Sequence, residues 1–304
     1  MSLPILTAAD IAPRVDWRDI VAALEKGSRG PIPVLGDQFL KSGEDTLMAR
    51  AAWIEGLGAG VKSFTVMPGN ARTGRPSVQG AMIVFDAETG APRAVLENDL
   101  ITWFKTAADS VLGARLLKPG GIAHLLIVGA GTVASSLIEA YRAVIGVERI
   151  TVWNRSPGRA AALVDRYGVE MATDLALAVD RADAIATATL SREPVVLGEW
   201  LRPGQHLDLV GAFRADMREV DDEALTRSRL FVDARETTLH HIGELKIPLA
   251  AGVITETDIE GDLRDLVSGR AGRRNADDIT LYKNGGGAHL DLMTANALMR
   301  IAGI

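Results

Sequence analysis

The sequence predicts an α/β protein with two domains, one built on an antiparallel sheet and one on a doubly wound parallel sheet. Residues 31–100 contain short apolar runs separated by turn residues, which is typical of a hairpin-rich antiparallel sheet. Residues 119–288 alternate apolar strands with helix-sized segments, which is typical of a parallel sheet covered on both faces. With 304 residues, 47% of them apolar, the chain is long enough for both domains.

The first domain begins with a predicted amphipathic helix over residues 16–26, where Ile20, Val21 and Leu24 recur at helical spacing. Four strands are expected in the runs TLMARAAWI, GVKSFTVM, QGAMIVFD and PRAVLEN. A helix over residues 100–117 follows and stops at Lys118-Pro119, which we take as a domain boundary. The last segment, DLMTANALMRIAGI, is another amphipathic helix that can pack back on this domain.

The second domain is predicted from six apolar runs, most of them followed by a helical or helix-sized segment. This order of elements is typical of a parallel sheet buried on both faces. The expected strands are residues 124–128, 149–153, 169–172, 184–189, 206–210 and 230–233.

Composition and charge narrow the possible partners. The 33 basic and 39 acidic residues leave a net charge of −6 and no basic run, which disfavours nucleic acid and favours a small molecule. The absence of cysteine excludes disulfides and thiolate metal sites, and no apolar run reaches the length of a membrane span. His240-His241 is expected in a helix, where neighbours point apart and cannot chelate one metal. We expect a cytoplasmic enzyme without a metal.

The stretch GAGTVA, which follows an apolar strand and precedes a helix, predicts a dinucleotide site. Gly129 permits the tight turn, Gly131 lets the backbone approach the pyrophosphate, and the small Ala134 allows close helix packing. Thr132 and Val133 lie in the first helical turn, whose N–H groups attract anions. A glycine turn in some other α/β protein is the alternative.

The next strand ends in Asn154-Arg155-Ser156, where an NAD-binding site usually has an acidic residue that holds the ribose hydroxyls. Arg155 and Ser156 can instead bind a 2′-phosphate, and Arg159 adds positive charge one turn later. These residues favour NADPH over NADH. A solvated arginine after a strand is the alternative interpretation.

Several blocks of sequence together resemble the ornithine cyclodeaminase/mu-crystallin family along nearly the whole chain. The resemblance implies a homodimer in which a β-rich domain of residues 1–118, joined by a C-terminal helix over 289–304, binds substrate and forms the dimer. It also implies that a Rossmann domain of residues 119–288 is inserted between them. The blocks are GVKSFTVMPGN, GRPSVQGAMIVFDAETGAPRA, ITWFKTAADS, GAGTVA, VWNRS, DLVGAF with REVDDE, and DITLYKNGGGAHLDL.

The resemblance also implies roles for single residues. Lys62 matches the family's active-site lysine, which can bind a substrate carboxylate and exchange a proton with the reacting nitrogen. Lys105 replaces the family arginine that clamps this carboxylate, and Arg50 could share the task. Asp291 matches an acidic position near the cleft between the family's two domains, and a helix-surface or capping role is the alternative. Thr106 and Ala107 match the segment that contacts the cofactor phosphates. Thr189 is also expected to bind the cofactor.

Phe213 departs from the family pattern, because ornithine cyclodeaminases have a catalytic aspartate at this position. Phenylalanine cannot titrate, so the resemblance disfavours cyclodeamination. A flat apolar wall beside the nicotinamide suits a small cyclic imine, and we assign Phe213 to the reaction site on that basis. Placement in the ordinary core is the alternative.

The leading hypothesis is an NADPH-dependent reduction of a cyclic ketimine carboxylate, such as Δ1-pyrroline-2-carboxylate to L-proline. An ornithine cyclodeaminase or an NAD-dependent amino-acid dehydrogenase is the second hypothesis. The third is a non-catalytic, NADPH-dependent binding protein similar to mu-crystallin, which the lysine at position 105 keeps open. Family membership alone does not choose among them.

Overall fold

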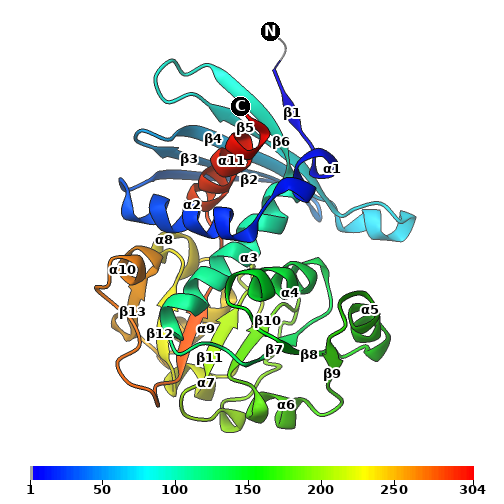
Figure 1. The fold of residues 1–304 in the computed structure, drawn as a ribbon, viewed down its shortest axis with the longest axis vertical. Coiled ribbons are helices and arrows are strands. Elements are labelled where there is room, and N and C mark those ends of the chain that lie inside the picture. The colour runs from blue at the N-terminus through cyan, green and yellow to red at the C-terminus, as the bar shows by residue number, and fades with distance from the viewer. Residues whose placement is uncertain (1–2) are drawn as a thin grey trace. The chain divides into compact units, whose positions relative to one another are not determined.

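The computed structural model describes residues 3–304, which divide into two compact units (Figure 1). Unit 1 contains the chain up to Lys105 together with Gly287–Ile304, and unit 2 is Thr106–Gly286. The predicted boundaries lay after residues 118 and 288. The first division falls earlier because helix α3 (Asn98–Leu117) runs across it. The sequence indicates where this helix stops, but not where along its length the packing partners change.

Unit 1 is built on one six-stranded sheet with the order β1-β6-β5-β4-β3-β2. All neighbouring pairs are antiparallel except β1 and β6, so the predicted hairpin-rich sheet is confirmed. The strand β2 was not predicted, because Gly36 and Asp37 interrupt its apolar pattern like turn residues. The elements are β1 (Ile5–Leu6), α1 (Ala8–Ile11), η1 (Ala12–Arg14), α2 (Trp17–Arg29), β2 (Val34–Ser42), β3 (Asp45–Ile54), β4 (Gly58–Val66), η2 (Pro68–Thr73), β5 (Val78–Phe85), β6 (Pro92–Glu97) and α11 (Ala288–Ala302).

Helices α2 and α11 pack against each other, so the last segment does join the first domain. The carboxylate of Asp16 caps α2 by accepting a hydrogen bond from the N–H of Arg18 (2.9 Å). The predicted stripe Ile20, Val21 and Leu24 is fully buried. A Cβ at residue 27 would stand 2.4 Å from the sulfur of Met293, so glycine at this position allows the two helices to approach closely.

The two faces of the sheet in unit 1 have different surroundings. Helix α11 contacts β3 and β4 on the inner face, where Arg50, Lys62 and Met82 lie opposite one another on neighbouring strands. On the outer face, Trp53 and Val34 are paired across β2 and β3 and are 59% and 71% exposed. The charged site of unit 1 therefore belongs to the covered face, while the other face leaves apolar side chains uncovered.

Unit 2 is built on an eight-stranded, entirely parallel sheet with the order β13-β12-β14-β11-β10-β7-β8-β9. The strand order reverses between β7 and β10, as in a doubly wound dinucleotide-binding fold. Its elements are β7 (His124–Val128), α4 (Thr132–Val144), β8 (Arg149–Trp153), α5 (Pro157–Tyr167), β9 (Glu170–Met171), α6 (Leu175–Arg181), β10 (Ala184–Thr187), η3 (Gly198–Trp200), β11 (His206–Leu209), α7 (Asp222–Thr226), β12 (Arg229–Val232), α8 (Arg235–Thr238), α9 (Gly243–Ala250), η4 (Glu256–Asp258), β13 (Ile259–Asp262), α10 (Leu263–Val267) and β14 (Thr280–Lys283).

The six predicted strands of unit 2 are all present, and two further strands, β13 and β14, were missed. Strand β14 lies between β11 and β12 and is fully buried, including its terminal Lys283. A buried lysine weakens the apolar pattern that identifies a central strand. The predicted helix around His240-His241 was wrong, because these residues lie in the turn between α8 and α9.

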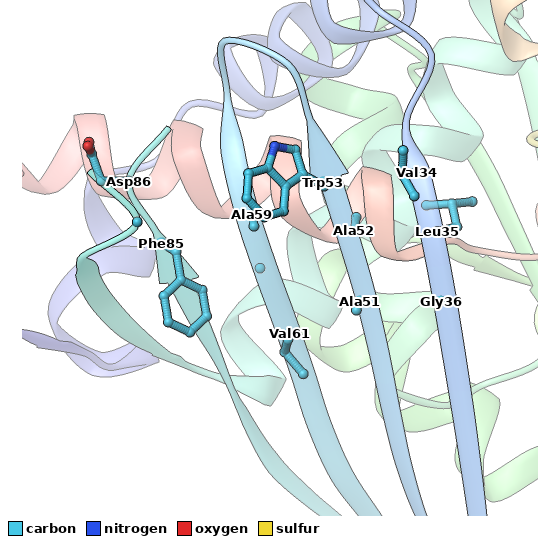
Figure 2. A pocket seen from close by; sticks show the side chains of 12 residues that line it. Val34, Leu35, Gly36, Ala51, Ala52, Trp53, Ala59, Val61, Phe85 and Asp86 are labelled. Atoms are coloured by element: carbon cyan, nitrogen blue, oxygen red, sulfur yellow. The ribbon is translucent and has the colours of Figure 1, made fainter. Parts of the chain in front are cut away.

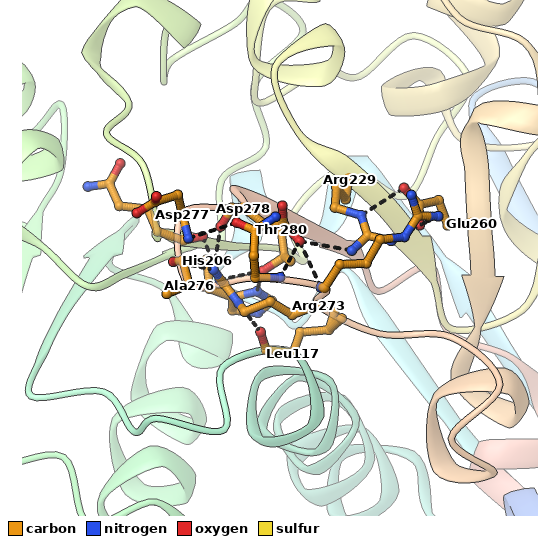
Figure 3. A network of polar contacts seen from close by, with 12 residues as sticks. Leu117, His206, Arg229, Glu260, Arg273, Ala276, Asp277, Asp278 and Thr280 are labelled. Atoms are coloured by element: carbon orange, nitrogen blue, oxygen red, sulfur yellow. Dashed lines mark hydrogen bonds and ion pairs between the residues drawn. The ribbon is translucent and has the colours of Figure 1, made fainter.

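The amino-terminal ends of β11, β12 and β14 are joined by a network around Arg273 (Figure 3). Its guanidinium donates to the backbone carbonyls of Leu117 (2.7 Å) and Gln205 (3.0 Å) and to the hydroxyl of Thr280 (3.0 Å). Arg229 pairs with Glu260 and with Asp278 in the same network. These contacts connect the amino-terminal ends of the strands, whereas the glycine loop lies at the carboxyl ends.

Candidate functional site

Unit 1 holds a buried cluster of charges on the inner face of its sheet. The Nζ of Lys62 lies 3.3 Å from Oδ1 of Asp291 in α11 and donates a hydrogen bond to the hydroxyl of Thr102 in α3 (2.9 Å). Lys62 is 6% exposed and Asp291 is 2% exposed. Lys62 is therefore not an exposed strand residue, and the alternative that Asp291 lies on a helix surface is wrong.

Arg50 and Lys105 add two more cations to this cluster. Arg50 stands directly opposite Lys62 in the β3–β4 ladder, and its guanidinium contacts the carboxylate of Asp37 through Nη2 (2.9 Å) and Nε (3.0 Å). Lys105 is buried at 7% exposure, and its charge acts on both Lys62 and Asp291. No ion pair reaches its ammonium from residues 3–304. Lys62, Lys105 and Arg50 thus place three positive charges around Asp291.

The cluster changes the protonation chemistry of its members. Burial lowers the pKa of Lys62, and the carboxylate of Asp291 opposes burial without cancelling it. The charges of Lys105 and Arg50 lower the pKa of Lys62 further. Burial also raises the pKa of Asp291, but the three surrounding cations hold it below its usual value. The result is a charged carboxylate beside an ammonium that gives up its proton more readily than an ordinary lysine.

Unit 2 contains a cavity of about 590 Å³ at the carboxyl ends of its strands, where doubly wound folds bind dinucleotides. Gly129 has φ +128°, and a Cβ there would stand 2.5 Å from the carbonyl of Ala188, so the turn requires glycine. Gly131 also lines the cavity, and nothing lies within 4 Å of the position of its missing Cβ. Its side-chain-free backbone leaves room for a pyrophosphate at the start of α4, whose first turn has no side-chain cap.

Positively charged side chains follow the carboxyl end of β8 and line this cavity. Arg155 and Arg159 are both exposed, and neither forms an ion pair with the part of the chain that the structure describes. The side chain of Asn154 donates to the carbonyl of Ser156 (3.0 Å), which shapes the turn between β8 and α5. The cavity therefore has unpaired guanidinium groups at this end, a group that forms charge-assisted hydrogen bonds with anions.

Some predicted residues do not line this cavity. Thr132, Val133 and Ala134 form the first turn of α4 behind the glycine loop. In α3, Ala107 is fully buried and the carbonyl of Thr106 accepts a hydrogen bond from Asn284 (2.9 Å), so their phosphate contact stays a prediction. The other predicted cofactor residues line the cavity, namely Gly129, Gly131, Asn154, Arg155, Ser156, Arg159 and Thr189.

Phe213 lies in the loop after β11 and is 55% exposed. The alternative that it belongs to the ordinary core is wrong. An exposed aromatic ring at the carboxyl end of a central strand is available to a ligand, and its role at the nicotinamide stays a prediction.

Sequence reasoning missed three contributors to the two sites. Thr102 accepts the hydrogen bond from Lys62, Asp37 holds Arg50, and Arg192 lines the dinucleotide cavity and pairs with Asp216 (3.0 Å). A helical threonine and a strand aspartate carry no signal in the sequence, because their importance depends on what the fold places beside them. Arg192 could have been considered, since it follows the end of a predicted strand.

None of the helices within residues 3–304 is both long and apolar enough to cross a membrane. In the same residues, no group of three or more histidine, aspartate or glutamate side chains is arranged to hold a metal ion. His240 instead contacts the carboxylate of Glu256 (3.2 Å) at the surface.

Comparisons with known proteins agree with this arrangement. The model of the ornithine cyclodeaminase/mu-crystallin family matches residues 20–300. The chain is 54% identical to a Δ1-pyrroline-2-carboxylate reductase of Paracoccus denitrificans over 303 residues, which cover 97% of this chain and 96% of that protein.

Two solved structures are similar over nearly the whole chain. The Δ1-pyrroline-2-carboxylate reductase of Thermococcus litoralis in complex with NADH and L-proline superposes with a TM-score of 0.90 and 28% identity, covering 99% of this chain and 97% of that chain. An archaeal alanine dehydrogenase dimer with bound NAD superposes with a TM-score of 0.91 and 28% identity, covering 99% and 96%. The family match, the close relative and the shared fold together show that this chain belongs to the ornithine cyclodeaminase/mu-crystallin family.

Proposed function

We propose that this protein reduces a cyclic ketimine carboxylate with NADPH, and that Δ1-pyrroline-2-carboxylate is converted to L-proline. The observation that carries this proposal is the buried carboxylate of Asp291 with three cations acting on it, Lys62, Lys105 and Arg50, of which the buried Lys105 has no ion-pair partner among the described residues. A substrate carboxylate supplies the missing negative charge. The relatives from Paracoccus denitrificans and Thermococcus litoralis are reductases of this substrate, which supports the choice.

Lys105 and Arg50 bind the substrate carboxylate in this proposal. Lys105 is a buried ammonium without an ion-pair partner among the described residues, and burying such a charge is costly unless a ligand compensates it. Arg50 offers a planar fork, but Asp37 already occupies part of it. Lys105 therefore supplies the charge, and Arg50 contributes orientation from the neighbouring strand.

Lys62 holds the proton of the reacting nitrogen. Protonation of the imine nitrogen by the Lys62 ammonium makes the adjacent carbon electrophilic. Addition of a hydride to that carbon gives the secondary amine, and the lysine regains its proton from solvent. The lowered pKa of Lys62 brings its ammonium closer to the range of a cyclic imine, so the proton can be shared between them. Asp291 and Thr102 keep Nζ in one position and stabilise its charged form. When bound, the reduced nicotinamide supplies the hydride.

The dinucleotide is NADPH in this proposal. An exposed arginine pair and Ser156 surround the end of β8, and no aspartate or glutamate stands at the position of Asn154 to repel a 2′-phosphate. Glu193 is the one carboxylate among the residues that line the cavity, against three arginines, Arg155, Arg159 and Arg192. The neighbouring structures contain NADH or NAD, which supports a nicotinamide dinucleotide of either kind.

The protein forms a homodimer through the outer face of the sheet in unit 1. A groove of about 600 Å³ crosses this face, lined by Trp53, Val61, Phe85 and their strand neighbours (Figure 2). Exposed apolar side chains of this size are unusual on a monomer and typical of an interface. Ile5 and Leu40 extend the apolar surface along the same sheet at 67% and 53% exposure. The similar alanine dehydrogenase is a dimer.

The test is a spectrophotometric panel in which NADPH and NADH are each offered with five- and six-membered cyclic imine carboxylates. We expect rapid NADPH oxidation with Δ1-pyrroline-2-carboxylate and formation of L-proline. Release of ammonia from L-ornithine without a net change in cofactor absorbance would identify a cyclodeaminase instead. Tight NADPH binding without oxidation by any imine would identify a binding protein.

A further inference from the structure

One buried carboxylate in unit 2 joins the loops that follow two neighbouring strands. Oε1 of Glu219 accepts hydrogen bonds from the backbone N–H and the hydroxyl of Thr189, each at 2.8 Å. Oε2 accepts from the backbone N–H groups of Gly211 (2.7 Å) and Ala212 (3.1 Å). Glu219 is fully buried, so these four donors take the place of water around its charge.

The two loops fit each other closely at this point. A Cβ at Gly211 would stand 2.1 Å from the carbonyl oxygen of Thr189 and 2.5 Å from Oε1 of Glu219. No side chain larger than hydrogen fits there without moving backbone. The loop after β10 and the loop after β11 are therefore in direct contact, and Glu219 is bonded to both.

Other buried charged groups fix the backbone around Glu219. The carboxylate of Glu244, in α9, accepts hydrogen bonds from the backbone N–H groups of Glu219 (2.8 Å) and Val220 (3.1 Å). The ammonium of Lys283 donates to the carbonyl of Leu209 at the end of β11 (2.9 Å), and its charge acts on both glutamates. Every polar group in this chain of contacts has a partner, so the carboxylate of Glu219 has little freedom to move.

The joined loops occupy the place where the second half of a dinucleotide binds. In a doubly wound sheet the two mononucleotide halves lie on either side of the reversal in strand order. Here the reversal falls between β7 and β10, so the glycine loop and Arg155 belong to the adenine half. Thr189 lines the cavity on the other side, and Phe213 directly follows the bonded Ala212.

We propose that Glu219 is a positioning residue for the nicotinamide half of the cofactor, a role that rests on the proposed reductase function. It acts through Thr189, Gly211 and Ala212 and does not touch the reacting atoms. A carboxylate suits this task because its two oxygens accept from all four donors at once. An amide can accept at one oxygen only and would turn an N–H group toward a donor.

The test compares Glu219→Gln with the natural protein and with Glu236→Gln, which alters an exposed carboxylate of the same unit. Two ligands are titrated, NADPH and adenosine 2′,5′-bisphosphate, which contains only the adenine half. We expect the variant to bind the bisphosphate normally and to lose about tenfold in NADPH affinity, with kcat for imine reduction about 10- to 100-fold lower. Glu236→Gln should change none of these values.

Thr189→Val provides a second variant, because it removes one donor to Glu219 and keeps the backbone N–H. It should shift NADPH affinity and kcat in the same direction but by less. The proposal is wrong if the ratio of NADPH affinity to bisphosphate affinity is the same in Glu219→Gln as in the natural protein. This includes an equal fall in both affinities, which is the result that a purely structural role predicts. This ratio is measured without substrate, so it remains decisive even if the natural protein reduces no imine.

Discussion

Lys62 is a lysine that the fold buries, and its proposed chemistry depends on this burial. Its strand neighbours place it on the inner face of the sheet, where α11 supplies Asp291 and α3 supplies Thr102. Burial alone would favour a neutral amine, whereas Asp291 favours the charged form. The ammonium is thus kept available and its proton is made easier to release.

Replacing Lys62 by alanine should lower kcat/KM for imine reduction by about 100-fold or more, because the proton donor to the reacting nitrogen is lost. NADPH affinity should stay near that of the natural protein, since Lys62 belongs to unit 1 and the dinucleotide cavity to unit 2. Steady-state kinetics and a fluorescence titration of NADPH check the two parts. A matching loss of NADPH affinity would show that the lysine has been given the wrong role.

Arg155→Asp should move the cofactor preference from NADPH toward NADH by about tenfold or more, because a charge-assisted contact to the 2′-phosphate is replaced by repulsion. The quantity to measure is the ratio of kcat/KM for the two cofactors. Lys246→Asp makes the same charge change on α9, outside the cavity, and should leave the ratio unchanged. An unaltered ratio in Arg155→Asp would remove the phosphate role.

Local patterns in the sequence identify some of the site residues and not others. Gly129, Gly131 and Arg155 were predicted because a strand, a glycine loop and a helix define their positions locally. Lys62 and Asp291 came from the family resemblance, and their pairing across 229 positions of sequence needed the fold. Thr102 and Glu219 were missed because their functions consist of contacts with residues distant in sequence.

Three elements of unit 2 are joined by a single buried carboxyl group. Asp208 in β11 accepts hydrogen bonds from Ser110 of α3 (2.8 Å) and Tyr141 of α4 (2.9 Å). Burial raises its pKa from 3.8 to about 7, although both hydrogen bonds and the charge of Lys283 act in the opposite direction. Strand β11 and the two helices therefore share a group that titrates near neutral pH.

The stability of the protein should consequently depend on pH. A carboxyl group with a raised pKa binds its proton more tightly in the folded state, so its stabilising contribution is present at low pH and is lost as the pH rises to 7. One such group changes the free energy of unfolding by about 1.4 kcal/mol per pH unit between its two pKa values.

Urea unfolding of the natural protein should show a falling midpoint between about pH 5.5 and pH 7 and little change above about pH 8. Asp208→Asn should reduce this slope without abolishing it, because burial also raises the pKa of Glu244 to about 7. Identical slopes in the variant and the natural protein would show that Asp208 does not titrate in this range.

Elements with a clear periodic pattern were predicted well. The strands β7 and β8 match their predicted bounds because they are continuous apolar runs between turn signals. The strands β2, β13 and β14 were missed because glycine, aspartate or a buried lysine interrupts each pattern. Their pairing in the two sheets compensates for weak local preference, which a local pattern cannot reveal.

At the scale of the whole molecule, the outer face of the sheet in unit 1 forms the proposed dimer interface. Trp53→Glu should convert the dimer to a monomer, because a carboxylate would be buried without a partner in the centre of the interface. Light scattering coupled to size-exclusion chromatography measures the mass. Leu177→Glu, on α6 of unit 2, makes the same type of change at 44% exposure and should leave the mass unchanged. A monomeric natural protein, or a dimeric Trp53→Glu, would contradict the proposed interface.

The sequence by itself determined the fold class, the two kinds of sheet, the glycine loop and the basic end of β8, because these features depend on short-range periodicity and turn chemistry. The tertiary structure alone decided which charges meet. It brought Arg50, Lys62 and Asp291 together from two strands and a helix, and it joined two loops through Glu219. The physical reason is that burial and electrostatic pairing depend on neighbours in space, which local patterns in a chain do not specify.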